Sequence, residues 1–293
     1  MRIQVMGLPL DLGAGCPGAA RGPRAIRRAG LGRALARLGH EVLDAGDVEL
    51  PPAGTAGPTR GMRHLPEVAS ACARLADAVC AALRAGWLPL VLGGDHSLTI
   101  GLLAGRRRAG RAGGVIWLDA HGDFNTPETS PSGNIHGMAL AAAAGRGARE
   151  LVGLGGGPSV TEQAAALVGV RALDPGERAA LAGSAVSVFP MADLARRGSA
   201  AVLRAAVAVA SADGRNPFHV SLDLDVLDPA CAPGVGTPVP GGLSVPEARD
   251  AMAALRASGL VDSVDAVECN PLLDPGERTA ALAVALLAAL LGG

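Results

Sequence analysis

The stretch Val115-Ile116-Trp117-Leu118-Asp119-Ala120-His121-Gly122-Asp123 joins an apolar run to three residues that commonly bind metals. Residues 115–118 have the continuous hydrophobicity of a strand buried inside a parallel sheet. Polar residues begin where this strand should end, and open α/β sheets bind their ligands at that edge. Asp119, His121 and Asp123 are spaced two apart, so an extended chain would direct their side chains to one side. The stretch predicts an α/β fold with a metal site at the sheet edge.

Short apolar runs alternate with longer helical segments along the rest of the chain, which predicts βα units around a parallel sheet. The expected strands are 3–8, 41–43, 88–92, 115–118, 166–170, 186–189, 219–224 and 264–268. The expected helices are 23–38, 66–85, 98–108, 201–211, 245–257 and 277–291. Glycine and proline mark two loops, 13–18 and 153–158, but neither resembles an interdomain linker. We therefore expect a single domain over residues 1–293.

Composition excludes several classes of function. The chain has 26 basic and 27 acidic residues, which gives no electrostatic case for binding nucleic acid or an anionic membrane. Its five cysteines form no CxxC pair, which argues against a disulfide framework or a zinc knuckle. The first residues lack the pattern of a secretory signal, and no apolar run is long enough to span a membrane. We expect a cytoplasmic protein whose ligand is a small neutral or zwitterionic molecule.

Three further polar clusters lie at the ends of expected strands. Gly93-Gly94-Asp95-His96-Ser97 supplies an imidazole. In Ser221-Leu222-Asp223-Leu224-Asp225, alternation places both carboxylates on the side of the strand that carries His219, which we expect to be the partner of a ligand. The third cluster is Val264-Asp265-Ala266-Val267-Glu268-Cys269-Asn270-Pro271.

Four carboxylates and two imidazoles from these motifs form a set that two divalent cations would neutralise: His96, Asp119, His121, Asp123, Asp223 and Asp225. Without a cation or a proton, such carboxylates would repel one another and lose solvation. Oxygen-rich sites favour Mg²⁺ or Mn²⁺, and the imidazoles favour Mn²⁺. Two ions about 3.5–4 Å apart can lower the pKa of a bridging water enough to produce hydroxide near neutral pH. The set indicates a hydrolase.

The three motifs, in this order, resemble the metal signatures of the ureohydrolases, a family that includes arginase, agmatinase, guanidinobutyrase and formiminoglutamase. The resemblance runs from Gly7-Leu8-Pro9 to Glu268-Cys269-Asn270-Pro271 and covers nearly all of the chain. It implies a three-layer α-β-α fold with a parallel, roughly eight-stranded sheet, and a dimanganese cofactor. It also implies a homo-oligomer, either a trimer or a hexamer.

The resemblance also implies how the six ligands divide. His96 and Asp123 would bind one manganese, and His121 and Asp225 would bind the other. Asp119 and Asp223 would bridge the two ions. A hydroxide held between the ions would then attack the guanidinium carbon of the substrate.

Three other residues receive roles from the same resemblance. We count Glu268, His136 and Asp123 as catalytic, and Glu268 and Thr237 as substrate-binding. Glu268 would pair with the guanidinium nitrogens, because a planar carboxylate suits their fork geometry. His136 would shuttle protons to the leaving amine or regenerate the hydroxide. Thr237 has a hydroxyl that would assist the same proton path.

Within the family, the segment from Asn125 to Asn134 resembles arginases rather than agmatinases. In arginases this loop receives the α-carboxylate through asparagine and hydroxyl side chains, here Asn125, Ser130 and Ser132, and an aspartate that corresponds to Asp174 helps to bind the α-amino group. This sequence departs from that pattern at two places. Ala172 stands where arginases commonly carry an acid, and the loop 13–18 lacks the basic residues often found there.

The sequence therefore predicts hydrolysis of L-arginine to L-ornithine and urea. Two alternatives stay open. In the first, the protein catalyses the same hydrolysis on a related guanidino compound, such as agmatine, 4-guanidinobutyrate or N-hydroxy-L-arginine. In the other alternative the chain is a non-catalytic binding subunit with the ureohydrolase fold, whose signature would be a lost ligand, and the sequence has lost none.

Overall fold

The computed structural model describes residues 1–50, 61–111 and 113–292. Their central element is an eight-stranded sheet with the order β2-β1-β3-β8-β7-β4-β5-β6, in which every neighbouring pair is parallel. The strands are β1 (Arg2–Leu8), β2 (Glu41–Asp47), β3 (Leu88–Gly93), β4 (Val115–Leu118), β5 (Ala165–Val168), β6 (Ser187–Phe189), β7 (Phe218–Asp223) and β8 (Val261–Val267). Each overlaps a strand expected from the sequence, which confirms the fold class.

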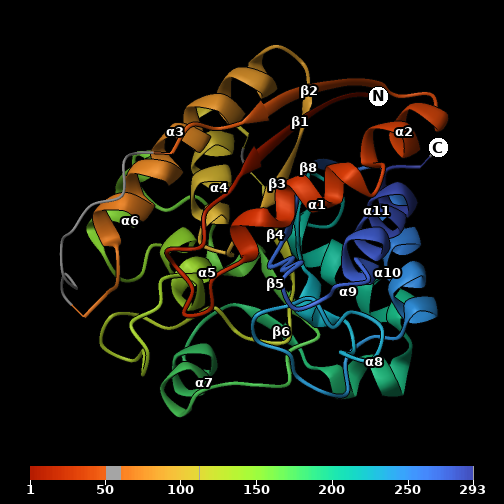
Figure 1. Cartoon of the computed structure of the whole chain (residues 1–293). Coiled ribbons are helices and arrows are strands. Elements are labelled where there is room, and N and C mark those ends of the chain that lie inside the picture. The colour runs from red at the N-terminus through yellow and green to blue at the C-terminus, as the bar shows by residue number, and fades with distance from the viewer. Residues whose placement is uncertain (51–60, 112, 293) are drawn as a thin grey trace.

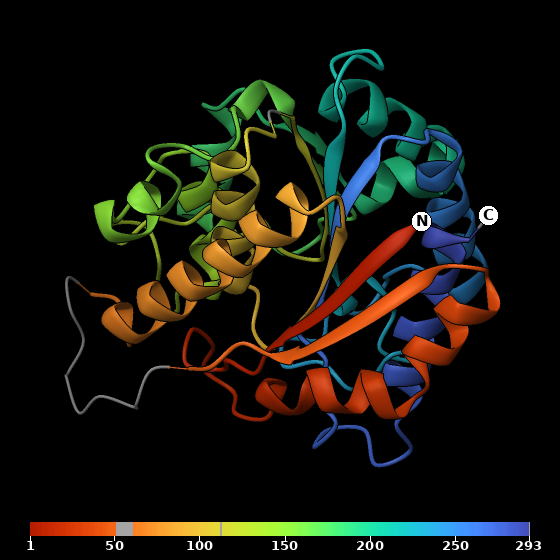
Figure 2. The same cartoon turned by 90° about the horizontal axis from the view of Figure 1, so that it is seen from above.

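Helices cover both faces of this sheet (Figures 1 and 2). They are α1 (Gly22–Arg28), α2 (Leu31–Arg37), α3 (Leu65–Arg84), α4 (Leu98–Arg108), α5 (Ala139–Ala143), α6 (Arg149–Val152), α7 (Pro175–Ala182), α8 (Met191–Arg197), α9 (Ser199–Ala210), α10 (Val245–Ala257) and α11 (Arg278–Leu291). Buried side chains of α3 to α7 form a core with one face of the sheet, and those of the other six helices form a core with the opposite face. The expected three-layer architecture is therefore confirmed.

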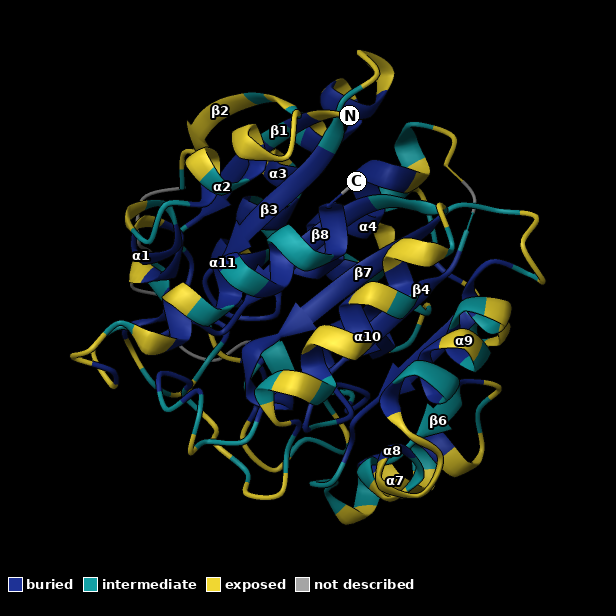
Figure 3. Ribbon diagram, turned by 90° about the vertical axis from the view of Figure 1, so that its right-hand side faces the viewer, coloured by how far each residue is buried: buried dark blue, intermediate teal, exposed yellow. Residues whose placement is uncertain are grey.

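The buried strands lie between helices whose outer surfaces are exposed (Figure 3). Two glycines of α4 let this helix approach α3 closely. A Cβ at Gly101 would lie 2.4 Å from the carbonyl oxygen of Cys72, and one at Gly105 would lie 2.6 Å from that of Ala76. Because α4 begins at Leu98, two residues after His96, this contact also anchors the segment that contains this predicted metal ligand.

The helical pattern expected over 23–38 is interrupted. It forms α1 and α2, which are separated by Ala29 and by Gly30, whose φ of 99° a residue with a side chain rarely adopts. Helices α5 to α8 were not expected. They are short, at four to eight residues, and so carry too few positions to show a helical period. No helix in the described ranges is long and apolar enough to cross a membrane.

Candidate metal centre and substrate cleft

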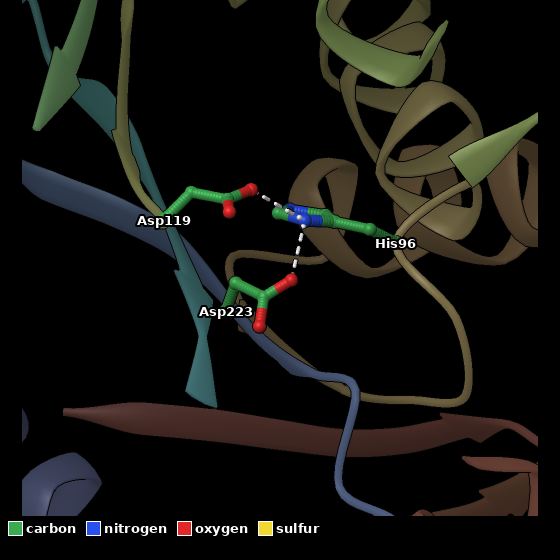
Figure 4. Close-up of side chains that lie close together, drawn as sticks. All are labelled: His96, Asp119 and Asp223. Atoms are coloured by element: carbon green, nitrogen blue, oxygen red, sulfur yellow. Dashed lines mark hydrogen bonds and ion pairs between the residues drawn. The ribbon is translucent and has the colours of Figure 1, made fainter. Parts of the chain in front are cut away.

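Three predicted ligands lie where central strands end. His96 follows β3, Asp119 follows β4, and Asp223 is the last residue of β7. The His96 ring lies between the two carboxylates, which come from neighbouring strands (Figure 4). His96 Nδ1 is 3.3 Å from Asp119 Oδ2 and 3.0 Å from Asp223 Oδ2. We name these three residues the first ligand group; one potential ligand atom from each lies within 4.8 Å of the others.

Asp119, His121 and Asp225 form a second ligand group with the same 4.8 Å limit. His121 Nδ1 is 2.9 Å from Asp225 Oδ2 and 3.4 Å from Asp119 Oδ1. Asp119 therefore belongs to both groups and turns one oxygen to each histidine. Asp123, the sixth predicted ligand, has Oδ2 at 3.1 Å from His96 Nδ1. The structure thus brings all six predicted ligands together.

The backbone reaches this arrangement by bending, whereas the sequence pattern predicted extended chain. After β4 the chain bends at Ala120 and His121, and Asp123 adopts a left-handed φ of 49°. After β7 it turns into a short 3₁₀ helix, Leu224–Val226, where the N–H of Asp225 donates to the Asp223 side chain at 2.8 Å. The period-two alternation was therefore wrong beyond the strand ends, although the side chains still converge.

Burial and mutual repulsion raise the pKa of Asp123, Asp223 and Asp225, whereas the two histidines hold the pKa of Asp119 below its usual range. Burial raises the pKa of Asp223 well above its usual range, and the charges of Asp225 and Asp119 raise it further. Burial and Asp119 also raise the pKa of Asp123 to about 6. Burial would lower the pKa of His121, but Asp119 and Asp225 raise it to about 12. Divalent cations would displace these protons and neutralise the acids, so this set of four carboxylates and two imidazoles fits a metal centre.

Trp117 of β4 orients two members of the first ligand group. Its ring stacks on that of His96, with centroids 4.1 Å apart and an interplanar angle of 13°. Its Nε1 donates a hydrogen bond of 2.9 Å to Asp119 Oδ2. The sequence placed Trp117 in a buried strand but gave no signal of the stacking, because His96 reaches it from the segment after β3.

Glu268 and His136 lie next to the first ligand group. Glu268 follows β8 with a left-handed φ of 63°. Its Oε1 accepts a hydrogen bond of 2.9 Å from the backbone N–H of His96 and lies 2.9 Å from His136 Nδ1. Burial would lower the pKa of His136, but the Glu268 carboxylate raises it to about 9. These two predicted catalytic residues are therefore ion-pair partners.

A cleft of about 500 Å³ connects the ligand groups with the predicted substrate residues. It is lined by His121, Asp123, Asn125, Ser130, Ser132, His136, Gly137, Arg171, Ala172, Leu173, Asp174, Glu177, Arg178, Asp223, Asp225 and Thr237. Every predicted substrate residue except Glu268 is among them. A larger cavity of about 760 Å³ lies near the amino ends of β4, β5 and β7, around Arg107, Gly114 and Asn216. None of the predicted site residues lines it.

The predicted substrate residues make hydrogen bonds within the cleft wall and to its neighbouring loops. Asn125 Nδ2 donates to Asp174 Oδ2 at 3.2 Å. Ser130 Oγ and Ser132 Oγ accept backbone N–H groups at 3.0 and 3.2 Å, so their own hydroxyl protons remain to be donated. Thr237 Oγ1 donates to Asp225 Oδ2 at 3.1 Å, which ties this residue to the second ligand group.

The loop 13–18, for which the sequence gave no role, touches the site through its backbone. The N–H of Gly13 donates to Asp95 Oδ2 at 2.8 Å, and its carbonyl accepts the N–H of His136 at 3.1 Å. A Cβ on Gly13 would lie 2.8 Å from Asp95 Oδ1, so a larger residue would not fit here. The loop therefore positions His136 through its main chain.

Several cleft residues were missed in the sequence, and two of them make contacts that shape the site. Glu177 is buried, and its Oε1 accepts the N–H of Phe124 at 2.9 Å; burial raises its pKa to about 7. The signal for it was its place in the same Asp-Pro-Gly-Glu segment as Asp174. Arg171 Nη2 donates to the carbonyl of Asp225 at 2.8 Å and to that of Val239 at 2.7 Å. Arg171 thereby links the loop after β7 to the segment that contains Val239.

Known proteins share this arrangement along the whole chain. The model of the Arginase family matches residues 1–292. The chain belongs to the arginase family. Among its arginase-family relatives, the arginase of Bacillus caldovelox is 44% identical over 297 residues, covering 99% of this chain and 98% of that protein. The arginase of Bacillus subtilis (strain 168) is 44% identical over 292 residues, with 99% and 97% covered.

Solved structures of the arginase family have the same fold. The crystal structure of arginase from Bacillus cereus matches with a TM-score of 0.93 at 45% identity and covers 100% of this chain and 99% of that one. The formimidoylglutamase of Bacillus subtilis matches with a TM-score of 0.80 at 23% identity, covering 99% and 86%, which shows the fold alone. These matches confirm the ureohydrolase resemblance, and the two ligand groups are candidate sites for the metals of this metal-dependent family.

Proposed function

We propose that this protein hydrolyses L-arginine to L-ornithine and urea and uses two Mn²⁺ ions per chain. The observation that carries the proposal is the cleft of about 500 Å³, whose lining includes Asp223 of the first ligand group, His121 and Asp225 of the second, and also Asn125, Ser130 and Ser132. A guanidinium at the ligand groups and a carboxylate at the amide and hydroxyl groups would thus occupy one connected space. The 44% identity with proteins named arginase, over nearly the full length, supports the same substrate.

In this proposal the six ligands divide between two ions. His96 and Asp123 hold one, His121 and Asp225 hold the other, and Asp119 and Asp223 serve both. The two oxygens of Asp119, each turned to a different histidine, support its shared role. The combination of carboxylates with imidazoles favours Mn²⁺ over Mg²⁺. When bound, such a pair supplies hydroxide near neutral pH by lowering the pKa of water.

Glu268, His136 and Thr237 act at the reacting end of the substrate. Glu268 Oε1 accepts both hydrogen bonds that its side chain receives from described residues, which leaves Oε2 to accept a guanidinium N–H. His136 has a pKa of about 9 and so carries a proton at neutral pH, which it donates to the departing δ-nitrogen of ornithine. Thr237 orients Asp225 through its hydroxyl group.

The opposite end of the cleft selects the substrate. L-Arginine differs from agmatine by one carboxylate, and the hydroxyl protons of Ser130 and Ser132 are available to receive it. Asn125 and Asp174, already hydrogen-bonded to each other, form the neighbouring wall, where Asp174 would meet the α-amino group. Polar groups left unpaired by a smaller ligand cost about 1–3 kcal/mol each, so the cleft discriminates against agmatine.

A side-by-side urea assay on L-arginine, agmatine, 4-guanidinobutyrate and N-hydroxy-L-arginine tests the proposal. We expect L-arginine to be preferred, with kcat/KM for agmatine lower by at least about two orders of magnitude, because the site is built to hydrogen-bond a group that agmatine lacks. Ser130→Ala and Ser132→Ala should lower kcat/KM for L-arginine while leaving the low value for agmatine unchanged.

The same assay separates the alternatives. Equal or better activity on agmatine would show that the serines do not receive a carboxylate. A preference for 4-guanidinobutyrate, which has a carboxylate and no α-amino group, would point to Ala172 and a weak amino-group site. No turnover of any of the four substrates, in a sample that metal analysis shows to be loaded, would favour the non-catalytic subunit.

The remaining expectations are proposals of the same kind. We propose that residues 1–293 form one domain, that the protein is a homo-oligomer, either a trimer or a hexamer, and that it works in the cytoplasm. Light scattering after size-exclusion chromatography measures the oligomeric state directly.

A further inference from the structure

His96 makes contacts through both ring nitrogens. Nδ1 faces the carboxylates of the metal centre, whereas Nε2 lies 2.7 Å from Ser221 Oγ. The Ser221 hydroxyl donates in turn to Asp265 Oδ1 at 2.7 Å. All three side chains are fully buried. A continuous chain of hydrogen bonds therefore runs from a predicted metal ligand to a carboxylate that contacts none of the six predicted ligands directly.

The register of three sheet strands brings the residues of this chain of hydrogen bonds side by side. Trp117 of β4 pairs with Ser221 of β7, and Ser221 pairs with Asp265 of β8. Their side chains project from the same face of the sheet, toward the helix layer that contains α3 and α4. The stacking of Trp117 on His96 fixes the plane of the imidazole, while Ser221 fixes which edge of the ring points away from the metal centre.

Asp265 is held as a hydrogen-bond acceptor. Besides Ser221, it receives the hydroxyl of Thr99 at 2.7 Å and lies 3.1 Å from His219 Nε2. Burial would raise the pKa of Asp265, but the charge and hydrogen bond of His219, the charge of His96 and the hydrogen bond from Ser221 hold it below its usual value. An ionised carboxylate only accepts, so the Ser221 proton is committed to Asp265. Ser221 then accepts from His96 Nε2–H, and in the neutral, metal-binding form of the imidazole this leaves the lone pair on Nδ1, on the side of the metal centre.

We propose that Ser221 and Asp265 are positioning residues that set the Mn²⁺ affinity of the His96 site. The proposal rests on the proposed function, because it concerns the same metal centre. Hydrogen bonds to the far nitrogen of a ligating histidine fix its tautomer and orientation and increase its basicity, and their loss weakens metal binding. His219 contacts Asp265 rather than any of the six predicted ligands. The expectation that it is the partner of a ligand was therefore wrong.

The test compares two serine variants in the full-length protein. Ser221→Ala removes the link to His96 and should weaken binding of one of the two Mn²⁺ ions roughly 10- to 100-fold. Ser263→Ala is the matched control. Ser263 is also buried in the sheet, and its hydroxyl lies 3.1 Å from His219 Nδ1, on the side away from His96. Its loss removes that contact and a hydrogen bond of 3.2 Å to Asp262 Oδ1, so it also costs a serine hydroxyl two partners, but Mn²⁺ affinity should stay within about twofold of the unchanged protein. Mn²⁺ titration of metal-stripped samples gives both constants.

Asp265→Asn provides a second variant should Ser221→Ala fold poorly. It keeps the shape of the side chain but removes its charge. It should also weaken the binding of the same Mn²⁺ ion. Because Ser221 and Asp265 act in series, the double variant should bind Mn²⁺ about as weakly as the weaker single variant, not weaker by the product of the two effects. With Mn²⁺ saturating, KM for L-arginine should be unchanged, because neither residue lines the cleft.

The outcomes separate the two proposals. Unchanged Mn²⁺ affinity in both Ser221→Ala and Asp265→Asn would overturn the positioning role and leave the proposed function intact. Equal weakening in Ser263→Ala would also overturn it, since any buried hydroxyl would then have the same effect. Failure of the unchanged protein to bind Mn²⁺, or to release urea from L-arginine, would instead overturn the proposed function.

Discussion

His136 combines a raised pKa with a position on the wall of the cleft, and its role depends on its proton. In His136→Asn an amide replaces the imidazole, so hydrogen bonding to Glu268 is retained but proton transfer is lost. We expect kcat to fall by about 10²- to 10⁴-fold, the usual contribution of a general acid. Both metals should remain bound, because no predicted ligand is changed. Steady-state kinetics and metal analysis of the same sample measure the two effects.

The pH profile provides the control for His136. The folded pKa of about 9 lies above the ordinary value because of Glu268, so the protonated form persists through neutral pH and is lost as the pH rises through about 9. If His136 is the proton donor, kcat of the unchanged protein declines there and His136→Asn lacks that decline. The same alkaline decline in both proteins would remove His136 from proton transfer.

Regular elements could be predicted where the sequence carries a full periodic pattern with clear ends. The expected bounds of α4, β4 and α10 agree with the structure at every residue. For α10, Ser244 and Glu247 form a capping box, with the N–H of Ser244 donating to Glu247 Oε2 at 2.9 Å. Short helices such as α7 (Pro175–Ala182) could not be predicted in this way, because tertiary packing rather than periodicity decides them.

The same distinction holds for the site. The six ligands could be predicted because each lies in a short motif at the end of a strand, and parallel strands bring such ends together. The contacts that hold these ligands in place could not be predicted from the sequence. Asp265 stands in a motif that the sequence singled out, yet its link to His96 requires the register between β7 and β8. Likewise Arg171 contacts carbonyl groups more than 50 residues away, and nothing local to it predicts this.

Removal of the metals should destabilise the whole molecule. The six ligands come from the end of β7 and from the segments that follow β3, β4 and β7, so cations at the proposed sites would join the centre of the sheet and bind only the folded chain. A ligand at 100 times its dissociation constant stabilises the folded state by about 2.7 kcal/mol. We therefore expect chelation to lower the melting temperature by at least about 5 °C. Differential scanning calorimetry with and without Mn²⁺ measures the shift.

The size of this shift should depend on pH. In the metal-free protein the pKa of Asp123 is raised to about 6, so its proton contributes stability that is present below its ordinary pKa and is lost as the pH rises through about 6. The cations also compete less with protons at higher pH. The difference in melting temperature between loaded and stripped protein should thus be larger at pH 8 than at pH 5. An equal difference at both values would argue against metal binding at these carboxylates.

The stacking of Trp117 on His96 gives the protein an optical reporter. The chain has two tryptophans, and they differ in environment: Trp117 contacts the metal centre, whereas the ring of Trp87 lies 4.1 Å from the guanidinium carbon of Arg2 near the surface. Intrinsic fluorescence should therefore change when Mn²⁺ binds, and that change should persist in Trp87→Phe. Occupancy of the centre then becomes visible in real time without a dye, a label or a substrate.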